Sequence, residues 1–171
     1  MKKIILFLFV ITCGNEFIIA QWQQTNGPYA GGVVYCFAMS GSNIFAGTNG
    51  GVFFSANNGT TWTGNTTGMI NTDVRSLAIS GSNIYAGTAG GGVYLSTDNG
   101  SSWSPDSTGM GNIWVSSLAI SDTTIYAGTY GGGVYSSTMN GSGWTADTTG
   151  MGNVNIFSLT ISGSTIYAGS Y

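Results

Sequence analysis

The residues that could carry chemistry in this chain are few, and their types exclude most forms of catalysis. The sequence has 171 residues, with three Lys or Arg, six Asp or Glu and no histidine. A Ser-His-Asp or Cys-His arrangement needs an imidazole base, and metal sites built from His and Cys fail for the same reason. A phosphate backbone requires a cluster of cationic side chains, so nucleic acid is excluded as a partner. We therefore expect a protein that is not an enzyme and that holds no metal or cofactor.

Paired carboxylates are the one catalytic arrangement that the composition leaves open. Five aspartates follow residue 20, and two carboxyl groups across a glycosidic bond could cleave it. However, Asp106 and Asp147 occupy the same position in successive repeats, and Asp98 lies in a predicted turn. Carboxylates that recur in this way are typical of solvated loops, and we interpret them so.

Residues 1–20 have the layout of a secretory signal peptide. Two lysines precede an apolar run over residues 4–11, and the segment ends on a small residue, Ala20. The run is too short to cross a hydrocarbon layer about 30 Å thick, which needs roughly 20 helical residues. We expect cleavage after Ala20 and a domain over 21–171 that is secreted or held in the cell envelope without membrane insertion. An uncleaved anchor and a lipoprotein site at Cys13 are the alternatives.

One segment of the sequence returns at a nearly constant interval. Trp22, Trp62, Trp103 and Trp144 are separated by 40, 41 and 41 residues, and an isoleucine follows each of them by 22 residues. Self-similarity at this period is typical of blades in a propeller.

Each repeat divides into four short strands. In the unit that begins at Val74 we expect strands over residues 74–79, 83–87, 93–96 and 102–104. In the first strand, alternation predicts the small residues Val74, Ser76 and Ala78 on one face and Leu77 and Ile79 on the other. Both faces are uncharged or nearly so, which indicates a sheet that is covered on both sides.

The third and fourth strands are joined by a predicted hairpin. Asn99-Gly100 is a dipeptide suited to the two positive φ angles of a type I′ turn, and Asn58-Gly59 and Asn140-Gly141 repeat it. Strands linked in this way are antiparallel.

Four antiparallel strands per repeat, stacked face to face around an axis, predict an all-β fold of the β-propeller type. We expect about three and a half blades: a last strand at 21–26, three whole units of about 41 residues, and a truncated fourth unit. Such a ring is incomplete or open, so we expect either a longer natural product or self-association through the open blade edges. A parallel β-solenoid is the alternative architecture.

The hairpin from Ser96 to Trp103 reads Ser-Thr-Asp-Asn-Gly-Ser-Ser-Trp. It resembles the Asp-box, S-x-D-x-G-x-x-W, of BNR-like repeats in sialidase-like, sortilin-like and photosystem-assembly-factor-like propellers. Two degenerate copies carry Asn57 and Met139 at the acidic position. The resemblance implies a structural box, in which the acidic group ties the turn and the tryptophan lies between sheets. Its residues here are Ser55, Asn57, Gly59, Trp62, Ser96, Asp98, Gly100, Trp103, Ser137, Gly141 and Trp144.

The same resemblance raises two alternative functions. For a sialidase-like hydrolase, the resemblance implies three arginines that bind the substrate carboxylate, and a tyrosine and glutamate pair that the enzyme uses. After residue 20 this chain has one arginine, Arg75, and no glutamate, so the bidentate clamp is missing. The photosystem-factor resemblance suggests an assembly or stability factor for a membrane complex.

Residues that break the repeat are the better candidates for recognition, because fold requirements recur in every unit whereas a ligand contact need not. Trp114 precedes a first strand where the other repeats carry valine, aspartate or asparagine, and Tyr130 and Arg75 lie on the same predicted rim. Aromatic and arginine side chains are favoured in contact hot spots. We therefore predict a non-enzymatic module that binds an unknown protein or glycan there. Simple packing of Trp114 against a neighbouring loop is the alternative.

Overall fold

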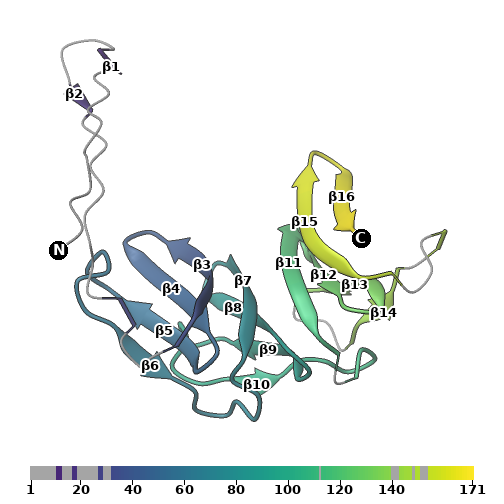
Figure 1. Ribbon diagram of the computed structural model, residues 1–171, viewed down its shortest axis with the longest axis horizontal. Coiled ribbons are helices and arrows are strands. Elements are labelled where there is room, and N and C mark those ends of the chain that lie inside the picture. The colour runs from purple at the N-terminus through teal and green to yellow at the C-terminus, as the bar shows by residue number, and fades with distance from the viewer. Residues whose placement is uncertain are drawn as a thin grey trace.

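The structure is a computed structural model that describes residues 11–12, 17–18, 27–28, 32–111, 113–139, 143–147, 149–150 and 154–171. Every helix or strand among these residues is a β-strand, which confirms the all-β prediction (Figure 1). The strand expected at 21–26 lies outside the described residues, as does most of the predicted signal peptide. Within the latter, β1 (Ile11–Thr12) and β2 (Phe17–Ile18) pair antiparallel.

Three four-stranded sheets follow one another along the chain, each with its strands in sequence order. We call the sheets blades. Blade 1 holds β3 (Val34–Ser40), β4 (Asn43–Thr48), β5 (Gly51–Ser55) and β6 (Thr63–Asn65). Blade 2 holds β7 (Val74–Ser80), β8 (Asn83–Thr88), β9 (Gly92–Ser96) and β10 (Ser104–Pro105). Blade 3 holds β11 (Val115–Ser121), β12 (Thr124–Thr129), β13 (Gly133–Thr138) and β14 (Thr145–Ala146).

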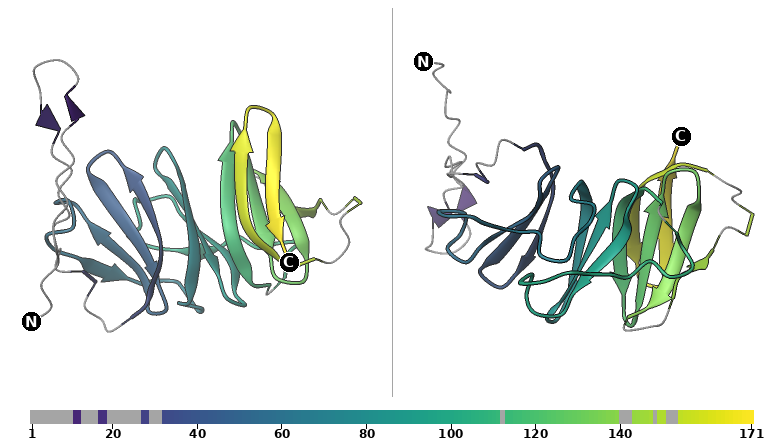
Figure 2. Two further views of the ribbon diagram at one scale, coloured as in Figure 1. Left: turned by 45° about the horizontal axis from the view of Figure 1, so that its top comes forward. Right: turned by 90° about the horizontal axis from the view of Figure 1, so that it is seen from below.

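A fourth blade is represented by β15 (Ile156–Ser162) and β16 (Thr165–Ser170), which pair with each other. Figures 1 and 2 show the blades fanned along an arc, with the first strand of each blade on the inner side. These first strands, β3, β7, β11 and β15, contact one another in succession. The chain is thus a partial β-propeller of about three and a half blades. The solenoid alternative is wrong, because all pairing is antiparallel within successive sheets.

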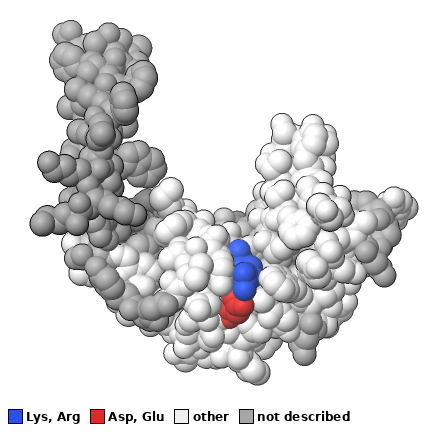
Figure 3. Space-filling model, viewed as in Figure 1, with Lys and Arg blue, Asp and Glu red and all other residues white. Residues whose placement is uncertain are grey.

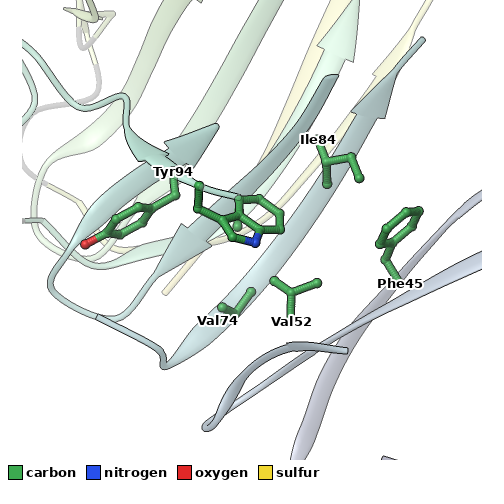
Figure 4. Packing of buried hydrophobic residues seen from close by; sticks show 7 residues of the cluster. Phe45, Val52, Val74, Ile84 and Tyr94 are labelled. Carbon is green, nitrogen blue, oxygen red and sulfur yellow. The ribbon is translucent and has the colours of Figure 1, made fainter. Parts of the chain in front are cut away.

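The hydrophobic core lies between blades rather than within any one of them. Phe45 and Val52 of blade 1 meet Val74, Ile84 and Tyr94 of blade 2, and Figure 4 shows these side chains facing each other across the gap between sheets. A second cluster joins blades 2 and 3 in the same way. Each blade is therefore stable only against its neighbours.

The recurring tryptophan fastens each blade to the one before it. Trp103 and Trp144 are each 4% exposed, and each belongs to the cluster shared with the preceding blade. The backbone N–H of Trp103 donates to the carbonyl of Thr67 at 2.9 Å, and that of Trp144 donates to the carbonyl of Thr108 at 2.7 Å. Both acceptors lie in the loop that leaves the preceding blade.

This contact explains why the last strand of blade 2 differs from the prediction. The structure places β10 at Ser104–Pro105, not at 102–104. The amide of Trp103 is directed to Thr67 in the preceding exit loop and does not pair with β9. The pairing of β9 and β10 begins one residue later, at Ser104.

The predicted alternation along the first strand is also wrong at one position. Val74 does not share a face with Ser76, because the register of β7 against β8 shifts between these two residues. Val74 packs with Leu77 in the cluster toward blade 1, whereas the Ser76 hydroxyl lies on the side of Gly87 and Val115, toward blade 3. Arg75 is the extra residue that the bulge accommodates.

The exit loop generates a direct test of the blade-to-blade contact. Gly68 has a φ of +87° and a Cβ there would overlap the carbonyl oxygen of Trp103, whereas Gly150, its counterpart, has a φ of +82° and open space. We expect Gly150→Ala to lower the free energy of unfolding by about 1 kcal/mol through backbone conformation alone. Gly68→Ala should lower it by about 3 kcal/mol or more, because overpacking is added. Urea unfolding measures both, and equal losses would contradict the contact.

Candidate recognition site

The second residue of every first strand is an extra residue in the strand pairing. In β3, Val34 pairs with Thr48 and Cys36 pairs with Gly47, so Tyr35 has no partner of its own. The same shift occurs in β7, β11 and β15. A bulge re-aims the side chain that it carries. The bulge residues are Tyr35, Arg75, Ser116 and Phe157.

Backbone pairing continues past the first two strands and brings Trp114 and Tyr130 together. The N–H of Tyr130 donates to the carbonyl of Trp114 at 2.9 Å, as the N–H of Ala89 does to the carbonyl of Asp73 in blade 2. The Trp114 and Tyr130 rings then lie 5.6 Å apart between centroids, with an interplanar angle of 31°. Offset ring pairs of this kind are favourable.

Arg75 joins this pair from the neighbouring blade. Its guanidinium carbon lies 3.9 Å from the ring centroid of Tyr35 and 5.1 Å from that of Trp114. Arg75 Nη2 also donates to Asp73 Oδ2 at 2.8 Å. The hydrogen bond to Asp73 is the main reason that the pKa of Arg75 is raised. The guanidinium is thus held by two rings and one carboxylate.

Phe157 extends the group into blade 4, since its ring meets Tyr130 edge-on at 6.2 Å and 78°. The three residues predicted for recognition, Arg75, Trp114 and Tyr130, are therefore brought together. We call these three residues, together with Tyr35 and Phe157, the rim cluster. The sequence signal for the last two was available, because they occupy the position that varies most in type within an otherwise recurring strand.

The rim cluster is accessible to solvent. Trp114 is 40% exposed, Tyr130 51% and Phe157 53%. Figure 3 shows one cationic and one acidic patch in contact on the face toward the viewer, just below the hollow of the arc, with uncharged surface around them. Arg75 is the one Lys or Arg in the described part of the chain, and Asp73 is its partner.

A hollow of about 290 Å³ adjoins the cluster on the same rim, lined by Ile70, Asn71, Gly90, Gly91, Tyr94, Pro105 and Ser107. Asn71 connects the two, because its Oδ1 accepts the N–H of Asp73 at 3.0 Å and its Nδ2 donates to the carbonyl of Ala89 at 2.9 Å. None of the lining residues is charged.

The described aspartates are divided between the two rims, with Asp106 and Asp147 in the same type of connection as Asp73. Asp122 lies in the turn between β11 and β12 and Asp98 in the turn between β9 and β10, on the rim opposite to Asp73. Among the described residues no group of three His, Cys, Asp or Glu could hold a metal ion. Burial raises the pKa of the Cys36 thiol to about 11, so little thiolate forms at neutral pH.

The turn between β9 and β10 has a closed set of hydrogen bonds. Asp98 accepts from the Ser96 hydroxyl at 2.7 Å and from the Ser102 N–H at 2.8 Å, and Ser96 Oγ accepts the Gly100 N–H at 2.8 Å. The φ angles of Asn99 and Gly100 are +56° and +82°, as a type I′ turn requires.

Blade 1 repeats this turn with an amide in place of the carboxylate. Asn57 Oδ1 accepts the Ser55 hydroxyl at 3.0 Å and the Thr61 N–H at 2.9 Å, and Ser55 Oγ accepts the Gly59 N–H at 2.9 Å. Trp62 Nε1 donates to the carbonyl of Gly59 at 3.1 Å.

Blade 3 departs from this pattern. Ser137 donates to the carbonyl of Gly143 at 2.8 Å, and Gly141 lies outside the described residues. The predicted box residues that are described thus lie at turns on the rim opposite to the rim cluster, with Trp103 and Trp144 buried between blades.

Antiparallel four-stranded blades on an arc define the class as a β-propeller. The chain belongs to the DUF6242 beta propeller family, whose domain model matches residues 20–165. No curated protein matches the sequence. Among the described residues there is also no helix with the length and apolar character that a membrane span demands.

Solved structures share the fold at low sequence identity. The extracellular domain of BT4673 from B. thetaiotaomicron is 22% identical with a TM-score of 0.70, over 88% of this chain and 21% of that chain. An ancestral GH74 enzyme is 24% identical with a TM-score of 0.68, over 86% and 23%. YCF48 bound to D1 peptide is 14% identical with a TM-score of 0.60, over 92% and 53%. The chain thus spans about half or less of each of these three proteins.

The carboxylate of Asp98 predicts a specific response to acid. Hydrogen bonds from the Ser102 side chain and backbone, and then from Ser96, lower the pKa of Asp98 from 3.8 to about 2. The ionised form therefore contributes stability above pH 3.8 that is lost as the pH falls toward 2. Asp98→Asn should unfold at nearly the wild-type temperature at pH 7, because Asn57 accepts the same two bonds through Oδ1 and replaces the third by donating from Nδ2 to Thr61 Oγ1.

Between pH 4 and 2 the wild type should lose more thermal stability than Asp98→Asn, and calorimetry at several pH values measures the difference. If the unfolding temperatures of the two proteins fall equally between pH 4 and 2, the turn does not stabilise the ionised form of Asp98.

Proposed function

We propose that the chain is a secreted, non-enzymatic propeller module that binds its partner at the rim cluster. The observation that carries this proposal is the convergence of residues that differ between repeats. Arg75, Trp114 and Tyr130 come from two blades. Arg75 and Trp114 stand where the other repeats carry different side-chain types, and Tyr130 stands where the first two blades carry Asn49 and Ala89 and the fourth carries Tyr171. Packing alone would be met by the same residue in every blade, so their difference supports a recognition role.

The exposure of the rim cluster supports binding rather than simple packing. Trp114 retains 40% of its surface in contact with solvent although its ring touches Tyr130 and Arg75. Exposed aromatic side chains held by a rigid scaffold are favoured in contact hot spots, because little side-chain entropy is lost on binding.

The absence of an assembled catalytic group in the described residues supports a non-enzymatic role. The sequence has no histidine, its one described cation is paired, and Asp73 and Asp122 lie on opposite rims. An extracellular location is supported by the predicted signal peptide and by the likeness to an extracellular domain.

Two other functions have some support. The likeness to an ancestral GH74 enzyme favours a carbohydrate-active hydrolase, and the likeness to YCF48 bound to D1 peptide favours a factor that assembles or stabilises a membrane complex. Both likenesses are below 25% identity and cover part of those chains, so neither outweighs the division of the aspartates between the two rims.

Photo-crosslinking tests the recognition role and does not require that the partner be identified first. A benzophenone amino acid is placed at Tyr130 in the rim cluster and, as matched control, at Ser82, which is exposed in the β7–β8 turn on the opposite rim. Illumination in the parent cell envelope should give adducts from position 130 that diminish in Trp114→Ala, and none from position 82. Equal yields at the two positions would refute the proposed surface.

Turnover is tested separately. The wild type and the double variant Asp73→Asn/Asp122→Asn are incubated with sialylated and neutral glycans, and released sugar is measured. We expect no release by either protein, since Asp73 and Asp122 lie on opposite rims. Release by the wild type that the double variant loses would establish a hydrolase instead.

A further inference from the structure

We infer that the rim cluster binds a neutral oligosaccharide or polysaccharide, with pyranose rings stacked on Trp114 and Tyr130. This inference rests on the proposed recognition role of the same residues and adds the chemical class of the ligand. It follows from the state of the charged groups, the free faces of the rings, and the polar groups next to the cluster.

The charged groups at the rim cluster are paired with each other, and the two polar atoms that the pair leaves without a hydrogen bond, Asp73 Oδ1 and Arg75 Nε, are buried. The guanidinium of Arg75 lies against the rings of Tyr35 and Trp114, and its Nη2 is bound to Asp73 at 2.8 Å. A carboxylate, sulfate or phosphate on a ligand would therefore find no free cation among the described residues. Because the ion pair is neutral overall, the surface is matched to a ligand without formal charge.

The ring faces fit the surface of a sugar. Trp114 and Tyr130 are 40% and 51% exposed although each touches another member of the cluster, so a substantial part of each ring remains free. A pyranose ring has C–H groups on its faces and hydroxyl groups along its edge. Stacking the C–H face on an aromatic ring buries apolar surface while the hydroxyls remain available for hydrogen bonds.

Neutral polar groups lie next to the cluster and in the adjoining hollow. Asn155 Oδ1 lies beside Gly131, the residue that follows Tyr130. Asn71 and the phenol of Tyr94 line the adjoining hollow. The Asn71 amide is bound to backbone groups at both polar atoms, whereas the Tyr94 hydroxyl accepts two backbone N–H groups and can donate its own proton to a ligand. Amide and phenol groups can donate and accept, which suits hydroxyl-rich ligands.

The spacing indicates a ligand of several sugar units. The centroids of Trp114 and Tyr130 lie 5.6 Å apart, close to the length of one pyranose unit, and their planes differ by 31°, whereas Phe157 meets Tyr130 edge-on. The hollow at Asn71 extends the surface beyond Asp73. A chain of sugars could therefore contact the cluster and the hollow together.

A peptide is less suited to this surface. Extended peptides gain much of their affinity by adding to a free strand edge, but β7 and β11 are each packed against the first strands of both neighbouring blades. The cluster also lacks a free charge that would select an acidic or basic sequence. Peptide binding is therefore an outcome of the test and not the inference.

Native affinity electrophoresis tests the inference with the whole chain. Gels contain a β-glucan, a xylan, a mannan or an α-glucan as neutral polysaccharides, or polygalacturonate as an anionic one. The variants are Trp114→Ala and Tyr130→Ala, with Tyr167→Ala as matched control, because Tyr167 is a 57% exposed aromatic on β16 outside the cluster. Circular dichroism verifies that each variant is folded.

We expect retardation by at least one neutral polysaccharide, weakened about tenfold or more in Trp114→Ala and Tyr130→Ala and unchanged in Tyr167→Ala. Dissociation constants from titrations in about 0.1 M and about 1 M salt should agree, because no ligand charge is involved. Retardation that survives in Trp114→Ala, or that occurs with polygalacturonate alone, would overturn the inference.

A failure of the ligand class is distinguishable from a failure of the recognition role. If no neutral polysaccharide retards the protein while crosslinking from position 130 captures a protein in a Trp114-dependent manner, the glycan inference is wrong and the recognition role stands. If position 130 gives no specific adduct and no polysaccharide binds, both are wrong.

Discussion

The insertion of one tryptophan between consecutive blades is the contact on which the rest of the structure depends. The indoles of Trp103 and Trp144 are almost fully buried against the preceding blade, and their backbone amides bond to the loop by which that blade ends. Since the hydrophobic clusters lie between sheets, no blade buries its apolar face alone. The tryptophan contact therefore sets the spacing of the blades and, with it, the order of the inner strands.

The fixed spacing explains how residues about 40 positions apart in sequence come to share one surface. The bulge in each first strand places one side chain per blade at an equivalent point. A second side chain comes from the residue before the first strand, and a third from the residue after the second strand. The fold thus supplies a repeated frame of positions whose residue types can change without disturbing the interblade clusters. The rim cluster uses these positions, and the turns that close the outer hairpins lie on the other rim.

Much of this could be predicted from the sequence, because the features that define a blade are local or strictly repeated. The tryptophan spacing predicted the blades, and Asn99-Gly100 predicted a turn with two positive φ angles. The strand over 102–104 was misplaced because the acceptor for Trp103 lies 36 residues earlier, in another blade. Val74 was assigned to the wrong face because alternation cannot reveal an inserted residue.

The bulge also explains which site residues were missed. Arg75 and Trp114 stood out as departures from the repeat and Tyr130 as a difference from Asn49 and Ala89, and the structure brings the three together. Tyr35 and Phe157 occupy the same bulge position as Arg75 but were not recognised, since strict alternation gives that position no special direction. Only the shifted register places them with the other three.

Nuclear Overhauser contacts of the Arg75 side chain test the central claim most directly, because they report whether three successive inner strands meet as described. With uniformly labelled protein, the Arg75 side-chain protons should show contacts to the rings of both Tyr35 and Trp114, and upfield ring-current shifts that diminish in Trp114→Leu. Contacts to neither ring, with random-coil shifts for Arg75, would contradict both the blade spacing and the recognition surface built on it.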